Sequence, residues 1–194
     1  RFNPLSLKSQ VEDLNILSIN TDFIKKINQN NSLAYGFEIT NNRLNSVGKN
    51  FEIITNNNLI IERNINDGLS RYPGNGSKYN SIAAYFELRK EFNEKTNLNI
   101  GSRYSFIDIS AEWDNNFLNE NQESFIFFKQ FNNFNLTNSA ITSSIGLSHL
   151  IDKFNKISLN ISSGFRAPNI DDIGKIREKS GILTVPNTSL KPEN

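Results

Sequence analysis

The sequence contains no cysteine and no methionine, and it has a single histidine, His149, and a single tryptophan, Trp113. Without cysteine there is no disulfide framework and no thiolate metal site, and one histidine cannot supply the ligands of a structural zinc ion. Because even a start methionine is missing, we expect Arg1 to be an internal position of a longer protein. The first ten residues lack the basic and apolar regions of a signal peptide, which leaves export open.

Charge and hydropathy exclude two further classes of protein. Lysine and arginine number 21 against 20 aspartates and glutamates, a net charge of +1, so the sequence has no electrostatic footprint for nucleic acid. No stretch approaches the ~20 consecutive apolar residues that a membrane-spanning helix needs. A membrane-spanning β-barrel stays possible, because only every second residue of its strands faces lipid.

Apolar residues recur at every second position in six segments, which is the pattern of β-strands with one apolar and one polar face. Between Thr96 and Phe106, for example, Leu98, Ile100 and Tyr104 share one phase, and polar residues occupy the other. The other five segments are Leu17–Phe23, Leu33–Thr40, Ser81–Arg89, Thr137–Leu150 and Lys156–Phe165. Each is close in length to the ~9–11 residues with which a tilted strand crosses a bilayer.

The connections between these segments alternate between short and long. The short ones lie near Asn28–Asn31, Asn93–Lys95 and Asp152–Asn155, and the long ones at about 47–78, 108–136 and 166–190. Outer-membrane barrels have short periplasmic turns and long extracellular loops. We therefore predict an all-β fold, an antiparallel up-and-down meander of roughly six strands that is part of a transmembrane β-barrel. The alternative is a soluble β-sandwich, whose strands alternate in the same way.

Two motifs near the end of the sequence carry a family resemblance: SSGFRAPNIDDIGK (Ser162–Lys175) and VPNTSLKPEN (Val185–Asn194). They resemble the "GFRAP" and "NPxLKPE" motifs of TonB-dependent receptors, and the stretches Ser70–Leu88 and Lys95–Phe106 resemble the same family's barrel. The Asn-rich loops are similar to those of Bacteroidetes receptors. The resemblance implies that residues 1–194 are a partial barrel domain, an internal fragment of a barrel of about 22 strands. The plug domain and the remaining strands would lie outside it.

The same resemblance implies a function and a location. The protein would lie in the outer membrane of a Gram-negative bacterium, in contact with its lipid, and would take up a scarce nutrient with energy from the TonB complex acting through the plug. A ferric siderophore is the first expected ligand and haem the second. Haem receptors of the family often have a histidine between the two motifs, whereas this sequence has neither histidine nor tyrosine from Asn169 to Pro186. Thr188 also replaces the proline of the second motif.

Five residues in the predicted loops are candidates for ligand contact: Arg71, Tyr72, Trp113, Phe117 and Arg166. Guanidinium groups pair with the carboxylates of a ligand, and aromatic rings stack against it. Trp113 equally suits the outer aromatic girdle of a barrel. Arg166 equally suits a structural corner, in which Pro168 ends the strand and the guanidinium pairs with a neighbouring carboxylate.

The remaining titratable residues predict no catalytic site and no metal site. His149 shares the strand face of the apolar residues and lies beside a short turn. We therefore expect it at the membrane interface. Asp171 and Asp172 are adjacent and would point apart on an extended chain. The acidic residues that follow Ile107 lack the regular spacing of a calcium-binding loop. We therefore expect no enzyme and no cofactor, and we keep a passive porin, another outer-membrane β-barrel or a β-sandwich adhesion module as alternatives.

Overall fold

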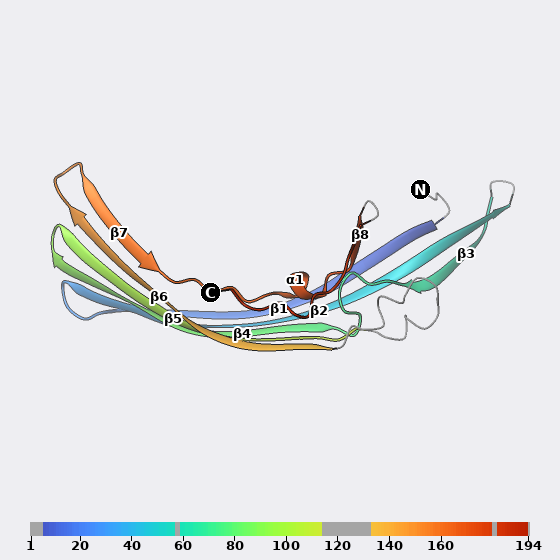
Figure 1. Ribbon diagram of the computed structural model, residues 1–194, viewed down its shortest axis with the longest axis horizontal. Helices are drawn as coiled ribbons and strands as arrows, with labels where there is room; N and C mark the ends of the chain where they lie inside the picture. The colour runs from blue at the N-terminus through green and yellow to red at the C-terminus, as the bar shows by residue number, and fades with distance from the viewer. Residues whose placement is uncertain (1–5, 57–58, 114–132, 180–181, 194) are drawn as a thin grey trace.

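The computed structural model describes residues 6–56, 59–113, 133–179 and 182–193. The strands are β1 (Ser6–Lys26), β2 (Asn31–Asn56), β3 (Leu59–Gly68), β4 (Ser77–Asn93), β5 (Thr96–Ala111), β6 (Phe134–Leu150), β7 (Lys156–Ser162), β8 (Arg177–Lys179) and β9 (Ile182–Thr184). Within those ranges there is one short helix, α1 (Ile170–Gly174). Figure 1 shows the long strands as a single curved sheet, with α1 on its concave side.

The sheet is an antiparallel meander in the order β1-β2-β4-β5-β6-β7, with β3 paired to the far half of β2. The predicted all-β meander is confirmed, and so are its three short turns. In the part of the chain that the structure describes, the other sheet is the two-stranded β8–β9 pair, so no second layer covers the large sheet as in a β-sandwich. The β-sandwich alternative is therefore wrong. None of the helical residues described could cross a membrane as a helix.

Five of the six predicted strands are longer than expected, and two of the predicted loops contain regular structure. The sixth, β7, is shorter, because it ends at Ser162 and not at Phe165. β2 has 26 residues and β1 has 21. The segment 47–78 is not one loop, because β2 continues to Asn56 and the chain returns along it as β3. The segment 166–190 likewise contains α1, β8 and β9. Of the segment 108–136, β5 takes the first residues and β6 the last, and most of the rest lies outside the described residues.

Along most of the length of its strands, the sheet is apolar on the convex face and polar on the concave face. Strand pairing places Ile39, Ile82 and Phe106 next to one another on the convex face, and all three are exposed. On the concave face, Arg103 forms an ion pair with Glu38 of β2. A sheet in water does not leave its apolar face uncovered, whereas a barrel wall turns that face to lipid and the polar face to its lumen.

The two faces exchange character near the end of the sheet from which the long connections leave. In β5, Ile107 and Ile109 belong to the concave face and are buried, while Asp108 belongs to the convex face. In β6, Phe134 is buried on the concave face and Thr137 pairs with Asp108 on the convex face. The alternation with a period of two thus continues, but the apolar residues now lie on the concave face and the polar residues on the convex face. In the sequence this change resembles the end of a strand, and for that reason these predicted strands stop too early.

A small hydrophobic core fills the concave side at this end of the sheet. Its buried members are Ile107, Ile109, Ala111, Trp113, Phe134, Ile173 and Ile176. The last two come from α1 and the residues after it, which lie across the concave face (Figure 1). α1 begins with a capping box, in which the Asn169 side chain accepts the Asp172 N–H at 2.9 Å and the Asp172 carboxylate accepts the Asn169 N–H at 3.1 Å. The core therefore fixes where the C-terminal segment lies.

Candidate functional site

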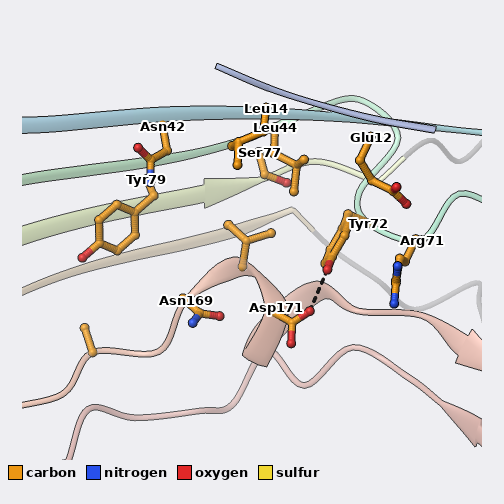
Figure 2. Close-up of a pocket in the computed structure, with 12 residues that line it drawn as sticks. Glu12, Leu14, Asn42, Leu44, Arg71, Tyr72, Ser77, Tyr79, Asn169 and Asp171 are labelled. Carbon is orange, nitrogen blue, oxygen red and sulfur yellow. Dashed lines mark hydrogen bonds between the residues drawn. The ribbon is translucent and has the colours of Figure 1, made fainter. Parts of the chain in front are cut away.

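A groove of about 580 Å³ lies between the concave face of the sheet and α1. Figure 2 shows its walls: β1, β2 and β4 on one side, and the loop before β4 and the start of α1 on the other. We call it the concave groove, and its lining includes Glu12, Asn42, Arg71, Tyr72, Ser77 and Asp171. Even-numbered positions of β1 and β2 and odd-numbered positions of β4 line it, because these share the concave face. The strand register thus selects which side chains a molecule in the groove would meet.

Tyr72, Asp171 and Lys175 form a hydrogen-bonded chain along one wall of the groove. The Tyr72 hydroxyl donates to Asp171 Oδ1 at 2.6 Å (Figure 2), and the Lys175 ammonium donates to both carboxylate oxygens at 2.7 and 2.9 Å. Burial, together with the hydrogen bond to Asp171, raises the pKa of Tyr72 to about 12. The hydrogen bonds from Lys175 and from Tyr72 lower the pKa of Asp171. Asp171 is therefore ionised at neutral pH, and its charge is balanced by Lys175.

Arg71 lies beside Tyr72 at the outer part of the groove. Its guanidinium carbon is 5.9 Å from the centre of the Tyr72 ring, within the range of a cation–π contact. Its carbonyl accepts the N–H of Ile176 at 2.8 Å, which ties this loop to the segment after α1. Figure 2 shows Glu12, from β1, on the same side of the groove as Tyr72 and Arg71. The groove therefore offers one guanidinium, one carboxylate and one aromatic ring.

The loop that carries Arg71 and Tyr72 is held to the sheet at several points. The Tyr72 N–H donates to Ser46 Oγ at 3.3 Å, and the Ser70 hydroxyl donates to the Tyr72 carbonyl at 2.6 Å. Pro73 is fully buried, and Gly174 of α1 packs directly against its ring. These contacts use backbone groups and small side chains, so the Arg71 and Tyr72 side chains are left to line the groove.

Arg166 connects the two C-terminal motifs of the sequence. Its guanidinium donates to both carboxylate oxygens of Asp172, at 3.2 and 3.1 Å, and lies 3.9 Å from a Glu193 carboxylate oxygen. Its backbone also pairs with that of Glu193. The expected pairing of Arg166 with a neighbouring carboxylate is thus present, whereas the strand ends at Ser162 and not at Pro168. Arg166 does not line the concave groove.

The chain matches the family model of the TonB dependent receptor-like β-barrel over residues 4–194. The chain belongs to this family. A search of the curated proteins found no match. TonB-dependent receptors are transporters of the Gram-negative outer membrane, so the family points to outer-membrane transport and to interaction with TonB. In such a barrel the convex apolar face is the lipid-facing wall, the concave face lines the lumen, and the long connections are extracellular.

In this TonB-dependent receptor barrel, the structure brings two of the five predicted ligand contacts together. Arg71 and Tyr72 line the groove at the extracellular end of the lumen. Trp113 is 6% exposed and belongs to the hydrophobic core, so its ring is on the luminal side and not in a lipid-facing girdle. Phe117 lies outside the described residues. The ligand-binding roles of these residues stay predictions.

The structure adds luminal residues that sequence reasoning did not select. Glu12, Asn42 and Asp171 line the groove from three different elements. Glu12 and Asn42 lie in the parts of β1 and β2 that extend beyond the predicted strand segments. If the alternation had been followed into these parts, both residues would have been placed on the concave face. Asp171 and Asp172 were expected to point apart on an extended chain. They are helical, and they serve different partners, Asp171 in the groove wall and Asp172 on Arg166.

His149 is exposed on the lipid-facing side beside the Asp152–Asn155 turn, and its Nδ1 lies 2.9 Å from the Thr96 hydroxyl. Its place at the membrane interface stays a prediction. Among the described residues, no group of three or more histidine, cysteine, aspartate or glutamate side chains is arranged to hold a metal ion.

Proposed function

We propose that this protein takes up a scarce nutrient across the outer membrane, with energy from TonB acting through a plug, and that the concave groove contacts the nutrient before it enters the lumen. The observation that carries the proposal is the position of Arg71 and Tyr72. Both line a cavity on the luminal wall of a TonB-dependent receptor barrel, on the side of the long extracellular connections. A ligand that enters from outside would meet this cavity first.

A ferric siderophore is the first candidate ligand and haem the second. Iron chelates of this kind are commonly anionic, and Arg71 supplies a guanidinium that pairs with carboxylates. Asp171 does not oppose such a ligand strongly, because Lys175 balances its charge at 2.7 Å. Two further polar atoms of the groove wall, Asn42 Oδ1 and Ser77 Oγ, are buried and have no hydrogen-bond partner within the described residues. The lack of histidine and tyrosine between Asn169 and Pro186 makes haem the weaker candidate.

Growth and uptake in the source bacterium test this proposal. Deletion of the gene is expected to abolish growth on one iron source, and radiolabelled uptake of that chelate is expected to need both TonB and the proton gradient. Uptake that continues without TonB would instead indicate a passive porin. Unchanged growth of the deletion strain on every iron source would contradict the assignment of iron as the nutrient.

Single substitutions test the groove itself. Arg71→Ala and Tyr72→Ala are each expected to weaken chelate binding by roughly tenfold, the loss of one charge-assisted hydrogen bond or one stacking contact. Lys153→Ala is the matched control, because this exposed cation lies in the turn at the opposite end of the barrel wall. Equal affinity in all three variants would show that the ligand does not use this groove.

A further inference from the structure

A row of polar side chains crosses the lipid-facing side of the sheet and marks one edge of its apolar band. We call it the boundary row, and it consists of Asn41, Asn80, Asp108 and Thr137, each opposite the next in the strand register. The Asn41 amide donates to Asn80 Oδ1, the Asn80 amide donates to Asp108 Oδ2 at 3.5 Å, and the Thr137 hydroxyl donates to Asp108 Oδ1 at 3.0 Å. The side chains of the row thus form hydrogen bonds with one another across four strands.

The distance from the boundary row to the periplasmic end matches the apolar thickness of a membrane. On β4, the lipid-facing residues between Asn80 and Lys90 are Ile82, Ala84, Phe86 and Leu88. Ten residues of strand, tilted as in outer-membrane barrels, cross roughly 26 Å, against about 25 Å for the apolar band of such barrels. The boundary row therefore lies where the hydrocarbon of the outer leaflet ends.

The next row towards the outside contains two cations and no carboxylate. In the strand register it reads Asn15, Arg43, Lys78, Ser110 and Asn135. Arg43 and Lys78 are directly opposite each other on neighbouring strands, both are exposed, and neither forms an ion pair with a residue that the structure describes. Like charges in this position repel each other unless an anion lies between them. We call this pair and its hydroxyl and amide neighbours the cation row.

The acidic groups nearest to the cation row do not cancel its charge. Asp108, in the boundary row, is diagonal to Lys78, but its two oxygens already accept from Asn80 and Thr137. Asp13 lies one row further out, opposite Asn45 and diagonal to Arg43, on β1. Arg43 and Lys78 belong to the central strands β2 and β4, which are paired on both sides, so their exposure does not depend on further strands beyond β1 or β7.

We propose that Arg43 and Lys78 bind the phosphate of an anionic lipid headgroup in the outer leaflet. A phosphate at this height would lie between the two cations and accept hydrogen bonds from both, with the Ser110 hydroxyl and the Asn15 amide as further donors. Because the row is cationic and lies just above the apolar band, the occupant that fits it is a membrane lipid with an anionic headgroup. The inference rests on the membrane placement of the wall and is independent of the nutrient that is transported.

Binding of lipid A to the intact receptor, purified from the outer membrane in neutral detergent, tests this inference. The double variant Arg43→Gln/Lys78→Gln is expected to bind lipid A roughly tenfold more weakly than the natural protein, since two charge-assisted hydrogen bonds are lost. Lys25→Gln/Lys90→Gln is the matched control, because these two lysines are on the same face at the periplasmic end. Arg43→Lys keeps the charge and is expected to retain most of the binding.

Three outcomes would overturn the inference. The first is equal affinity of the double variant and the natural protein for lipid A. The second is equal affinity of the natural protein for lipid A and for lipid A without its phosphates. The third is displacement of lipid A by inorganic phosphate at similar concentration, which would show a site for free phosphate. Unchanged circular dichroism and thermal unfolding of the double variant would show that a loss of binding is not a loss of folding.

Discussion

Arg166 and Glu193 pair through their backbones: the N–H of each donates to the carbonyl oxygen of the other, at 3.0 and 2.9 Å. Arg166 belongs to the GFRAP motif and Glu193 to the LKPE motif, so the two motifs close a loop that contains α1, β8 and β9. The guanidinium of Arg166 also reaches Asp172, whose carboxylate caps α1. One residue thus holds both ends of the segment that covers the hydrophobic core.

The first prediction concerns this closure. Arg166→Ala removes both ion pairs, but the side chain is 61% exposed, so we expect a loss of about 1 kcal/mol or less. The effect should be local and should appear as amide hydrogen exchange up to about fivefold faster from Asn169 to Glu193. Arg166→Lys should recover part of the protection. Faster exchange throughout β4 and β5 would contradict a local role.

The second prediction concerns the packing of Gly174 against Pro73. A Cβ on Gly174 would lie 3.0 Å from Pro73 Cδ and 3.1 Å from Pro73 Cγ, and Pro73 is fully buried. Gly174→Ala should therefore destabilise the docked α1 segment by about 1–3 kcal/mol, the usual effect of overpacking. Limited proteolysis between Ala167 and Lys179 would measure this as faster cleavage.

Gly164→Ala is the matched control for that substitution, since a Cβ at Gly164 would meet no atom within 4 Å. It should leave the cleavage rate unchanged. Similar rates for both variants would mean that the contact between Gly174 and Pro73 does not hold the segment in place.

The third prediction concerns the pH dependence of the Tyr72–Asp171 hydrogen bond. The pKa of Tyr72 is raised from 10.0 to about 12, so the folded protein keeps the phenol proton while an unfolded chain loses it. The contribution of Tyr72 to stability is complete below pH 10.0 and is lost as the pH rises through about 12. Because the pKa of Asp171 is lowered from 3.8, its contribution is present above that pH and disappears as the pH falls through the lowered value.

Ultraviolet absorbance of tyrosinate measures the first of these shifts. Asp171→Asn removes the charge that disfavours the phenolate, so Tyr72 should titrate at a lower pH in this variant than in the natural protein. Tyr72→Phe identifies the signal, because the difference between the two titrations should vanish in that background. An identical titration of the natural protein and Asp171→Asn would contradict the coupling.

The fourth prediction tests which face of the sheet meets lipid. Ile141 of β6 is 71% exposed on the convex face, and Ala140 is its neighbour on the concave face. Ile141→Arg should destabilise the folded receptor in a bilayer by about 2–4 kcal/mol, the cost of an arginine near the middle of the lipid-facing band. Ala140→Arg should cost less, because its guanidinium reaches the lumen. Urea unfolding in lipid vesicles measures both, and a larger loss for Ala140→Arg would reverse the assignment of the faces.

Much of the wall could be predicted from the sequence, because alternation is a local property. Leu98, Ile100, Tyr104 and Phe106 share one phase, and in the structure they share the convex face. The short turns could also be predicted, since Asn and Asp side chains there bind the backbone; the Asp152 carboxylate accepts the N–H groups of Phe154 and Asn155 at 2.8 and 2.9 Å. Less of the candidate site could be predicted from the sequence: Arg71 and Tyr72 were predicted to contact a ligand, whereas Glu12 and Asn42 were not.

The sequence by itself determined the antiparallel β-strands, the order of the meander, the alternation of short turns with long connections, and the family motifs. Each of these depends on residues that are close together in the chain. Only the tertiary structure decided how the groove is built and which residues meet in it. Ile109 faces the lumen because Ile173, from a distant segment, packs beside it in the core. Tyr72 and Asp171 meet because that core carries α1 onto the sheet. Contacts between residues so far apart depend on the folded chain, and no local pattern encodes them.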